Sequence, residues 1–447
     1  MKSVSIIPLG CPKNDVDSEL IAGSFRKEGY RVEWDTMSCD TVVINTCGFI
    51  KDAIDESLDA IMQAIKAKQE GRVKRIVVAG CLSQRFGDRL AGQLDEVDIF
   101  AGVDGIGGIP ELVRQTGAGI PLASRTSAVP SGRSPVAYPE AVERYRYGNA
   151  HSAYLKIAEG CSNNCSYCVI PFIKGRLKSR RTGDIVSEAK LLVDRGAVEL
   201  CIVAQDTLNY GTDRGGSEIV QLLSALEKIR DLKWIRLNYL YPSHITGRLL
   251  DFIAGSEKIV PYFDVPIQHI SDHVLKLMNR TTTSSDIKGV IDRIRERIKD
   301  PFLRTTVIVG FPGETEENFG ELLDFFGAYP FHRIGVFPYS REEPAPASRL
   351  RNQVPQRSLT ERVSRISELA GRIMHAMADG FIDKTYEMLI EGQDPADPGT
   401  TFARPWFFAP EIDGYVLLHD RTVPKKGRFA TVKITDAIGP DLAGEIV

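Results

Sequence analysis

The sequence predicts an α/β protein of three parts: an N-terminal open α/β domain, a central partial barrel of six βα units, and a small C-terminal β-barrel. Three observations predict this fold. Over residues 1–118, short runs rich in Val and Ile alternate with helical patterns, as in sheets of buried parallel strands. The alternation resumes with longer helices over residues 148–379. Residues 380–447 carry only short alternating runs separated by Gly and Pro, which is typical of a small all-β domain.

In the first part, three apolar runs predict buried strands at residues 3–9, 41–45 and 75–79, with helical patterns between them at residues 15–28 and 52–69. A strand, a helix and a second strand in this order form a βαβ unit with parallel strands. Residues 119–147 are rich in Pro, Ser and Gly, and this composition predicts a linker.

In the central part, strands are expected at residues 153–158, 198–204, 234–240, 262–267, 303–309 and 334–339. The helical patterns that follow them are residues 184–195, 218–230, 245–254, 272–278 with 284–298, 315–326, and 358–378. Six consecutive βα units predict a barrel-like sheet with its site at the carboxyl ends of the strands. Three alternating runs, at residues 385–390, 415–418 and 428–435, predict strands of the terminal barrel.

Composition narrows the class of protein. The 447 residues are 43% hydrophobic and 26% charged, with a net charge of −3, so the chain as a whole is not a polyanion binder. No apolar run is long enough to span a membrane. The first residues lack the length and cleavage site of a signal peptide. We therefore expect a cytoplasmic protein with no membrane partner.

Six of the eight cysteines fall into two sets of three, and the first set is Cys161-Ser-Asn-Asn-Cys165-Ser-Tyr-Cys168. These three thiols follow a predicted strand directly and can surround one metal centre. A tetrahedral zinc site needs a fourth ligand, whereas three thiolates suit a four-iron cluster with one open iron. The alternatives are a structural zinc ion or unrelated free thiols.

The second set is Cys11, Cys47 and Cys81, each just past the end of a predicted strand and one βαβ step from the next. If these strands are neighbours, the three thiols lie along the crevice where open α/β sheets bind ligands. A second cluster site is therefore predicted; the alternative is that they are small buried hydrophobic residues. Cys39 and Cys201 are assigned no role.

The spacing C-x3-C-x2-C with Tyr167 before its last cysteine resembles the signature of the radical S-adenosylmethionine superfamily. Together with the second triad and the terminal β-domain, it makes the whole chain resemble the methylthiotransferase family of that superfamily. The N-terminal part then resembles the methylthiotransferase domain, the central part the radical core, and the last part a TRAM domain. The stretches that carry the resemblance include Leu9-Gly-Cys-Pro-Lys-Asn14, Asn45-Thr-Cys-Gly-Phe49, Ile308-Val-Gly-Phe-Pro-Gly-Glu314 and Ala409-Pro-Glu-Ile-Asp-Gly414.

The resemblance implies S-adenosyl-L-methionine and two [4Fe-4S] clusters as cofactors, one held by Cys11, Cys47 and Cys81, the other by Cys161, Cys165 and Cys168. It implies a radical that abstracts hydrogen from an unactivated carbon, where sulfur and a methyl group are then added. No catalytic residue is expected beyond the clusters. Tyr167, Gln205 and Glu314 occupy positions where such a barrel would bind S-adenosylmethionine.

Local features resemble the RimO-type branch of the family, whose target is an aspartate β-carbon on small-subunit ribosomal protein twelve. They are Val16-Asp-Ser-Glu19 after the first cysteine motif, Pro-Ile-Gln-His-Ile up to Ile270, and Tyr339-Ser-Arg-Glu-Glu343. Two stretches depart from the pattern: Pro344-Ala345, where a Gly-Thr pair is expected, and the bulky Pro405-Trp-Phe-Phe408.

Charge offers an independent test of the substrate. Residues 383–447 hold eleven acidic and seven basic side chains, a balance of −4. A domain that docks on RNA should be basic, whereas an acidic domain suits a basic ribosomal protein; a solvated surface without a partner is the alternative. We expect Glu411 and Asp413 to contribute to this docking surface. The basic stretch over residues 174–181 is expected to hold carboxylates of cofactor or substrate, or else to be a solvated loop.

The partners implied are the basic ribosomal protein as substrate, a low-potential electron donor and a sulfur donor, with the chain itself a monomer. A tRNA adenosine methylthiotransferase is the alternative enzyme, so tRNA is the less favoured substrate. A non-catalytic iron–sulfur electron carrier is the alternative class. It is disfavoured because carriers normally ligate every iron, while each site here offers three cysteines.

Overall fold

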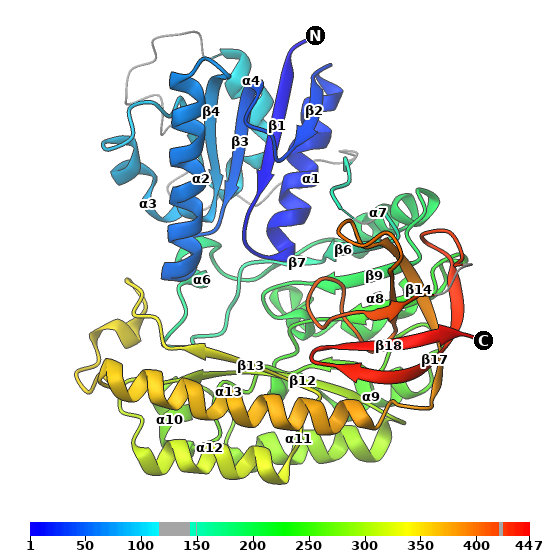
Figure 1. Ribbon diagram of the computed structural model, residues 1–447. Helices are drawn as coiled ribbons and strands as arrows, with labels where there is room; N and C mark the ends of the chain where they lie inside the picture. Colours follow the sequence, from blue (N-terminus) through cyan, green and yellow to red (C-terminus); the bar gives the residue numbers. More distant parts are fainter. Residues whose placement is uncertain (116–143, 149, 420–422) are drawn as a thin grey trace.

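The N-terminal domain is a five-stranded parallel sheet in the order β2-β1-β3-β4-β5 (Figure 1). The computed structural model describes residues 1–115, 144–148, 150–419 and 423–447. The strands are β1 (Ser3–Pro8), β2 (Arg31–Trp34), β3 (Cys39–Thr46), β4 (Val73–Gly80) and β5 (Ile99–Ala101). The helices are α1 (Pro12–Lys27), α2 (Lys51–Gln69), α3 (Cys81–Ala91) and α4 (Ile109–Gln115), with the 3-10 helix η1 (Val103–Gly108). The predicted open α/β domain is confirmed, and β2 and β5 are additions at its two edges.

Alternate residues of the same strands enter two separate cores, one on each face of this sheet. Val42 and Ile44 of β3 pack with α2 and α3, while Val43 packs with α1 and α4. A parallel sheet covered on both faces needs apolar residues at every position. This is why its central strands read as continuous Val and Ile runs.

The central domain is a partial barrel of six parallel strands arranged as two three-stranded sheets, β6-β9-β10 and β11-β12-β13. A parallel bridge between Ile235 and Ile259 joins the two halves. No pairing between β6 and β13 occurs within the described part of the chain, so the barrel is open on that side. The strands are β6 (Ser152–Lys156), β9 (Glu199–Val203), β10 (Trp234–Leu237), β11 (Tyr262–Asp264), β12 (Phe302–Val309) and β13 (Arg333–Pro338).

The helices of this domain cover the outside of the barrel and share one large apolar core with its strands. They are α7 (Thr182–Asp194), α8 (Ile219–Glu227), α9 (Gly247–Ala254), α10 (Asp272–Leu277), α11 (Ser284–Arg297), α12 (Glu316–Ala328) and α13 (Gln356–Asp379). Between β6 and α7 lie β7 (Ala158–Glu159), α6 (Ile170–Ile173) and β8 (Lys178–Ser179). The six predicted βα units are confirmed.

The C-terminal domain is a closed five-stranded barrel in the order β14-β15-β16-β18-β17. Its strands are β14 (Thr385–Gln393), β15 (Thr401–Pro405), β16 (Val416–Leu418), β17 (Phe429–Ile438) and β18 (Asp441–Ile446). The predicted small β-barrel is confirmed, with β15 and β18 in addition to the expected strands. The predicted linker over residues 119–147 lies for most of its length outside the described residues.

The C-terminal barrel caps the amino-terminal ends of the six central strands. The first residue of every one of these strands contacts the C-terminal barrel. Ser152 and Glu199 accept hydrogen bonds from Arg404, and Tyr262 and Arg333 donate hydrogen bonds to the carboxylate and the carbonyl of Asp413. Trp234 packs on Phe429, and Phe302 stacks on Phe407. The opposite, carboxyl ends of the strands are therefore the end left for a site.

The N-terminal domain packs against those carboxyl ends, with the carboxyl edge of its own sheet turned towards them (Figure 1). The ammonium of Lys13, on α1, lies 3.8 Å from the ring centroid of Tyr239, which follows β10. Arg85, on α3, pairs with Glu342, which follows β13, at 2.9 Å. The strand ends of two domains thus face each other across one interface.

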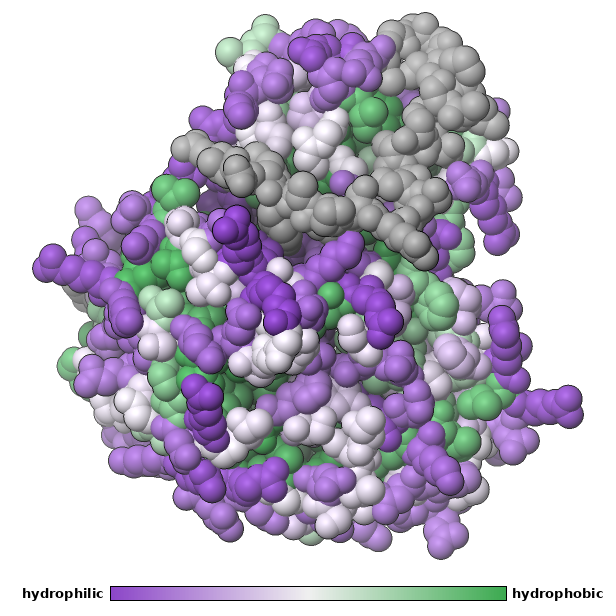
Figure 2. Space-filling view, turned by 180° about the vertical axis from the view of Figure 1, so that it is seen from behind, coloured by the Kyte–Doolittle hydropathy of each residue, from purple (hydrophilic) through white to green (hydrophobic). Residues whose placement is uncertain are grey.

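No helix among the described residues is long and apolar enough to cross a membrane. The face seen in Figure 2 is largely hydrophilic, with hydrophobic residues in several separate areas.

Candidate active site

The three cysteines of the first triad lie on the loop between β7 and α6, at the carboxyl end of the first barrel strand. The Cys161 amide donates to the Gly175 carbonyl at 3.1 Å, and the Cys168 amide donates to the Cys165 carbonyl at 3.1 Å. Gly160 precedes the loop with φ +75°, and a Cβ there would collide with the Arg176 carbonyl. Only glycine combines this turn with so close an approach of two backbones.

Hydrogen-bond donors point at the sulfur atoms of this loop. The Ile170 amide lies 3.4 Å from the Cys168 Sγ, and the Arg280 guanidinium lies 4.0 Å from the Cys165 Sγ. Burial raises the pKa of Cys161 to about 11 and that of Cys168 to about 12. Thiols held this way ionise when a metal displaces the proton, and donors aimed at sulfur are what an iron–sulfur cluster needs around its ligands. The loop therefore fits the cluster that its sequence predicts.

Three further residues that the sequence predicted near the cofactor lie around this loop. Tyr167 is enclosed between the cysteines and Arg280, and burial raises its pKa well above the ordinary value. Gln205 donates through Nε2 to Glu159 at 2.8 Å, and its buried Oε1 has no hydrogen-bond partner within the described residues. Such an orphaned acceptor is rare in a folded protein and is available to a ligand.

Glu314 is fully engaged with its own chain. One carboxylate oxygen accepts from the Gly310 amide at 2.9 Å, and the other from Arg362 at 2.7 Å. These bonds hold the turn after β12, where Gly310 has φ +76°. A direct contact between Glu314 and the cofactor stays a prediction.

The second triad follows three adjacent strands of the N-terminal sheet. Cys11 follows β1 and precedes α1, Cys47 follows β3, and Cys81 begins α3 directly after β4. The prediction of a shared site required that the three strands be neighbours. β1, β3 and β4 are parallel neighbours, so the three cysteines lie along the same edge of the sheet. A Cβ on Gly10 would lie 2.7 Å from the Cys47 Cβ, so the loops of Cys11 and Cys47 are in contact.

Asn14 connects the three strand ends. Its Nδ2 donates to the carbonyls of Leu9 at 2.9 Å and Thr46 at 3.1 Å. Its Oδ1 lies 3.9 Å from the Cys81 Sγ. Asn14 stands in the quoted motif of the first cysteine, but the motif alone assigned it no role.

Two thiols of this second triad, those of Cys47 and Cys81, are buried, while Cys11 is partly exposed. Burial raises the pKa of Cys81 to about 12 and also raises that of Cys47. Within the described ranges, no three His, Cys, Asp or Glu side chains converge as they would on a single metal ion. A four-iron cluster takes each thiolate on a different iron, so it suits a wider set of ligands than zinc does.

The two remaining cysteines lie away from these sites. Cys201 is fully buried inside β9, and burial raises its pKa strongly. Cys39 begins β3, at the opposite end of the sheet from the second triad, and its thiol lies 3.1 Å from the Thr41 carbonyl.

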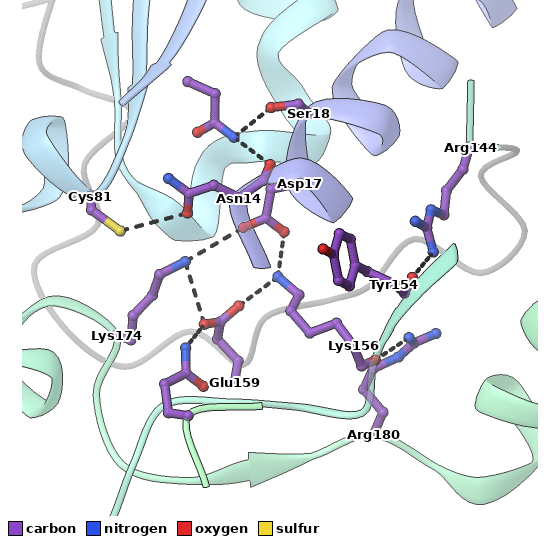
Figure 3. A network of polar contacts seen from close by, with 12 residues as sticks. Asn14, Asp17, Ser18, Cys81, Arg144, Tyr154, Lys156, Glu159, Lys174 and Arg180 are labelled. Carbon is purple, nitrogen blue, oxygen red and sulfur yellow. Dashed lines mark hydrogen bonds and ion pairs between the residues drawn. The ribbon is translucent and has the colours of Figure 1, made fainter. Parts of the chain in front are cut away.

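A buried polar network lies near Cys81 of the second triad and includes residues on both sides of the first triad in sequence (Figure 3). Glu159, two residues before Cys161, accepts from Lys156 at 2.7 Å and lies 3.3 Å from Lys174. Burial alone would raise the pKa of Glu159, but the two ammonium groups lower it far below its ordinary value. Asp17 of α1 pairs with the same two lysines. Sequence reasoning quoted Asp17 only as part of Val16-Asp-Ser-Glu19 and assigned no role to Asp17, Lys156 or Glu159, because an ion pair between distant segments leaves no periodic signal in the sequence.

This network corrects the expectation for the basic stretch over residues 174–181. Lys174 is 3% exposed and faces two carboxylates of its own chain. Arg180 pairs with Glu188 at 2.6 Å and is 9% exposed. Both cations are occupied within the fold, so the expected role in holding carboxylates of cofactor or substrate is wrong for these two residues.

The two departures from the family pattern are both buried contacts between domains. Ala345 packs with Cys81, Val169 and Ile173 in a small apolar cluster between the two triads. Phe407 and Phe408 are at most 1% exposed and pack on Phe302 at the base of the central barrel. The bulky aromatic stretch is therefore part of the fold of this chain.

One of the two residues expected on the acidic docking surface is buried in the structure. Asp413 is 1% exposed and accepts from Tyr262 at 2.7 Å and Arg304 at 2.9 Å. Its charge belongs to the contact between the terminal and central domains, so its assignment to a partner surface is wrong. Glu411, two residues earlier, is exposed.

Three family models match consecutive parts of the chain. They are described as an uncharacterized protein family, UPF0004, over residues 3–102, the radical SAM superfamily over residues 155–326, and the TRAM domain over residues 382–447. Among solved structures, the radical S-adenosylmethionine methyltransferase TsrM from Kitasatospora setae, with cobalamin and a [4Fe-4S] cluster bound, has a TM-score of 0.56 at 18% identity. The alignment covers 77% of each chain, and at this identity the likeness concerns the fold alone.

Similarity to proteins of known name extends over the whole chain. The ribosomal protein uS12 methylthiotransferase RimO of Bdellovibrio bacteriovorus is 42% identical over 100% of this chain and 98% of its own length. The protein of the same name from Clostridioides difficile is 40% identical over 100% of this chain and 99% of its own length. Because similarity at this level includes all three domains, the chain belongs to the family of the ribosomal protein uS12 methylthiotransferase RimO.

Proposed function

We propose that the chain is a radical S-adenosylmethionine methylthiotransferase that adds a methylthio group to an aspartate β-carbon of ribosomal protein uS12. The observation that carries this function is the placement of two cysteine triads at the facing carboxyl ends of two sheets. The name shared by full-length relatives supports uS12 as the substrate and disfavours the tRNA alternative.

The proposed ligands of one [4Fe-4S] cluster are Cys161, Cys165 and Cys168; those of a second cluster are Cys11, Cys47 and Cys81. When bound, the clusters supply the electron that cleaves S-adenosylmethionine and a place where sulfur is held for methylation. The chain contributes the thiols, the Ile170 and Arg280 donors aimed at sulfur, and the domain interface at which Cys47, Cys81 and Cys161 are buried.

For S-adenosylmethionine itself, the proposed contacts are Tyr167, Gln205 and Glu314. Gln205 offers its unpartnered Oε1 as an acceptor. Tyr167 adds a partly buried ring beside the cysteines, and Glu314 holds the turn after β12 in place. Their common position at the carboxyl ends of the strands is where barrels of this kind bind their ligands.

The proposed reaction also requires partners. It consumes electrons and one sulfur atom, so a low-potential electron donor and a sulfur donor are needed. Since the substrate is a ribosomal protein, we place the enzyme beside ribosomes in the cytoplasm, as a monomer.

Mass spectrometry of uS12 and tRNA from cells with and without this protein tests the proposal. We expect uS12 from the deficient cells to be lighter by one methylthio group and the tRNA to be unchanged. The parent gene should restore the modification, and a Cys161→Ala variant should not. Loss of a methylthio group from tRNA with unchanged uS12 would favour the alternative enzyme.

A further inference from the structure

Four buried charged residues form a closed ring of alternating sign at the interface between the N-terminal and central domains (Figure 3). This ion ring consists of Asp17, Lys156, Glu159 and Lys174. Lys156 contacts both carboxylates, directly on Asp17 and at 2.7 Å on Glu159. Lys174 lies 3.5 Å from Asp17 and 3.3 Å from Glu159. The four side chains are 1–5% exposed, so water does not screen them.

Each member of the ion ring belongs to an element that carries or adjoins a cysteine of the two triads. Asp17 is on α1, whose N-cap residue is Cys11. Glu159 ends β7, two residues before Cys161, and Lys156 ends β6, with one residue between it and the start of β7. Lys174 caps α6, which begins two residues after Cys168. The ring therefore joins the start of one triad to both ends of the other.

A buried ring of this kind is poorly explained as a stabilising device. Removing four charges from water costs several kcal/mol for each ion, and apolar residues of similar volume are often as good or better for stability. What a closed ring does supply is a single docking geometry, because sliding one domain past the other breaks several charged contacts at once. The net charge of the ring is zero, since its two ammonium groups balance its two carboxylates.

A second set of contacts, made by Arg85, connects the loop of Cys47 to the central domain. Arg85 donates to the carbonyl of Gly48, next to Cys47, at 2.8 Å, and pairs with Glu342 at 2.9 Å. The loop that follows Glu342 returns to the first triad, where the Ala347 amide donates to the Ser166 carbonyl at 2.8 Å. Ser166 lies between Cys165 and Cys168. Polar contacts thus connect Cys47 to the radical loop as well.

From this arrangement we infer that the ion ring and Arg85 are positioning residues that set the separation and orientation of the two clusters, and thereby couple cofactor cleavage to sulfur transfer. The inference rests on the proposed function, since it requires that both triads hold clusters.

The same helix offers a matched control. Glu19 is two residues after Asp17, is 5% exposed, and pairs across the same interface with Arg144 at 2.6 Å and Arg146 at 3.1 Å. Its partners adjoin no cysteine of either triad. If buried ion pairs here only hold the domains together, Asp17 and Glu19 should be interchangeable in their effects.

The test compares the holoenzyme with Asp17→Asn, Arg85→Gln and Glu19→Gln variants. For Asp17→Asn and Arg85→Gln we expect unchanged iron content. Pulsed electron paramagnetic resonance should show a weaker magnetic interaction between the two reduced clusters. The amount of S-adenosylmethionine cleaved per methylthio group formed should rise at least fivefold. Dipolar coupling falls with the cube of separation, so a small displacement of one site is measurable. Glu19→Gln should leave the coupling and the ratio within twofold of the parent.

Hydrogen exchange of the apoprotein gives a readout without clusters: Asp17→Asn should speed exchange at residues 11–18 and 156–174 more than Glu19→Gln does. An unchanged cluster interaction in Asp17→Asn, or equal effects of Asp17→Asn and Glu19→Gln, would overturn the inference. If Asp17→Asn does not fold, Arg85→Gln decides by the same measurements. If the parent does not modify uS12, the proposed function fails, while the magnetic interaction still tests the positioning role.

Discussion

The hydroxyl of Tyr262 donates a hydrogen bond of 2.7 Å to the carboxylate of Asp413. This contact links the first residue of β11 to the C-terminal barrel, and the second Asp413 oxygen accepts from Arg304 at 2.9 Å. The sequence alone placed Asp413 on a surface that binds a partner, but in the structure Asp413 is buried at the contact between two domains. The terminal barrel closes the amino-terminal end of the central strands, while the cysteine sites occupy the other end.

Asp413→Asn should destabilise the protein, because the change removes the buried carboxylate that pairs with Arg304 at 2.9 Å and leaves Arg304 only the more distant Asp264, at 3.5 Å. We expect a loss of about 3 kcal/mol, as for other broken buried pairs. Urea unfolding followed by circular dichroism measures it. Glu411→Gln, an exposed neighbour, is the control and should cost less than about 0.5 kcal/mol. Equal effects of the two variants would mean that Asp413 does not hold this contact.

Glu411→Lys tests what remains of the acidic docking surface. A single exposed charge contributes up to about 1 kcal/mol, so the Michaelis constant for uS12 should rise about threefold. The effect should shrink at high salt, where exposed charges are screened. Glu411→Gln should show about half the change. Steady-state kinetics at two salt concentrations measures both, and a Lys variant with the Michaelis constant of the parent would exclude Glu411 from the dock.

The two triads predict about eight irons per chain after anaerobic reconstitution, four in each cluster. Replacing Cys161, Cys165 and Cys168 by Ala should leave about four. Iron analysis together with the visible absorption of the clusters makes the measurement. Cys39→Ala is the control, since that thiol lies at the far end of β3, and it should retain the full iron content. Retention of all iron by the triple variant would refute the assignment of the first triad.

Cys47→Ala should abolish methylthiolation of uS12 and spare cleavage of S-adenosylmethionine. The reason is that cleavage needs only the triad of the central barrel, while Cys47 follows β3 of the other domain. Chromatographic assay of 5′-deoxyadenosine beside mass spectrometry of uS12 separates the two steps. The division of labour is wrong if a folded Cys47→Ala protein forms no 5′-deoxyadenosine.

Asp15 makes stability depend on pH. Burial, followed by the neighbouring carboxylates of Glu411, Glu19 and Asp17, raises its pKa from 3.8 to about 7. Between these values the folded state binds more protons than the unfolded state, so stability falls as pH rises from 3.8 towards 7. Asp15→Asn removes this penalty.

The melting temperature of the Asp15→Asn variant should therefore exceed that of the parent by about 2–4 °C at pH 8, with a smaller gain at pH 5. Differential scanning fluorimetry at the two pH values is sufficient. Asp59→Asn, at an exposed position on α2, should show no such trend. A gain that is larger at pH 5 than at pH 8 would contradict the sign of the shift.

The sequence by itself determined the three-part fold and the position of all six proposed cluster cysteines at or just after strand ends. Both follow from local information, because a run of apolar residues marks a buried strand wherever it lies. In a parallel sheet, the ends of neighbouring strands then meet at one edge. The strands that escaped prediction, β2, β5, β8, β15 and β18, are short or partly polar and carry little periodic signal.

Only the tertiary structure decided how the two sites face each other and which charged residues lie between them. Asp17 and Lys156 are 139 positions apart, and nothing in the residues around either one indicates a partner. The burial of Asp413 likewise depends on Tyr262 and Arg304, which belong to another domain. A charge is buried only when the fold brings an opposite charge or donors to it, and that pairing is a property of the assembled domains.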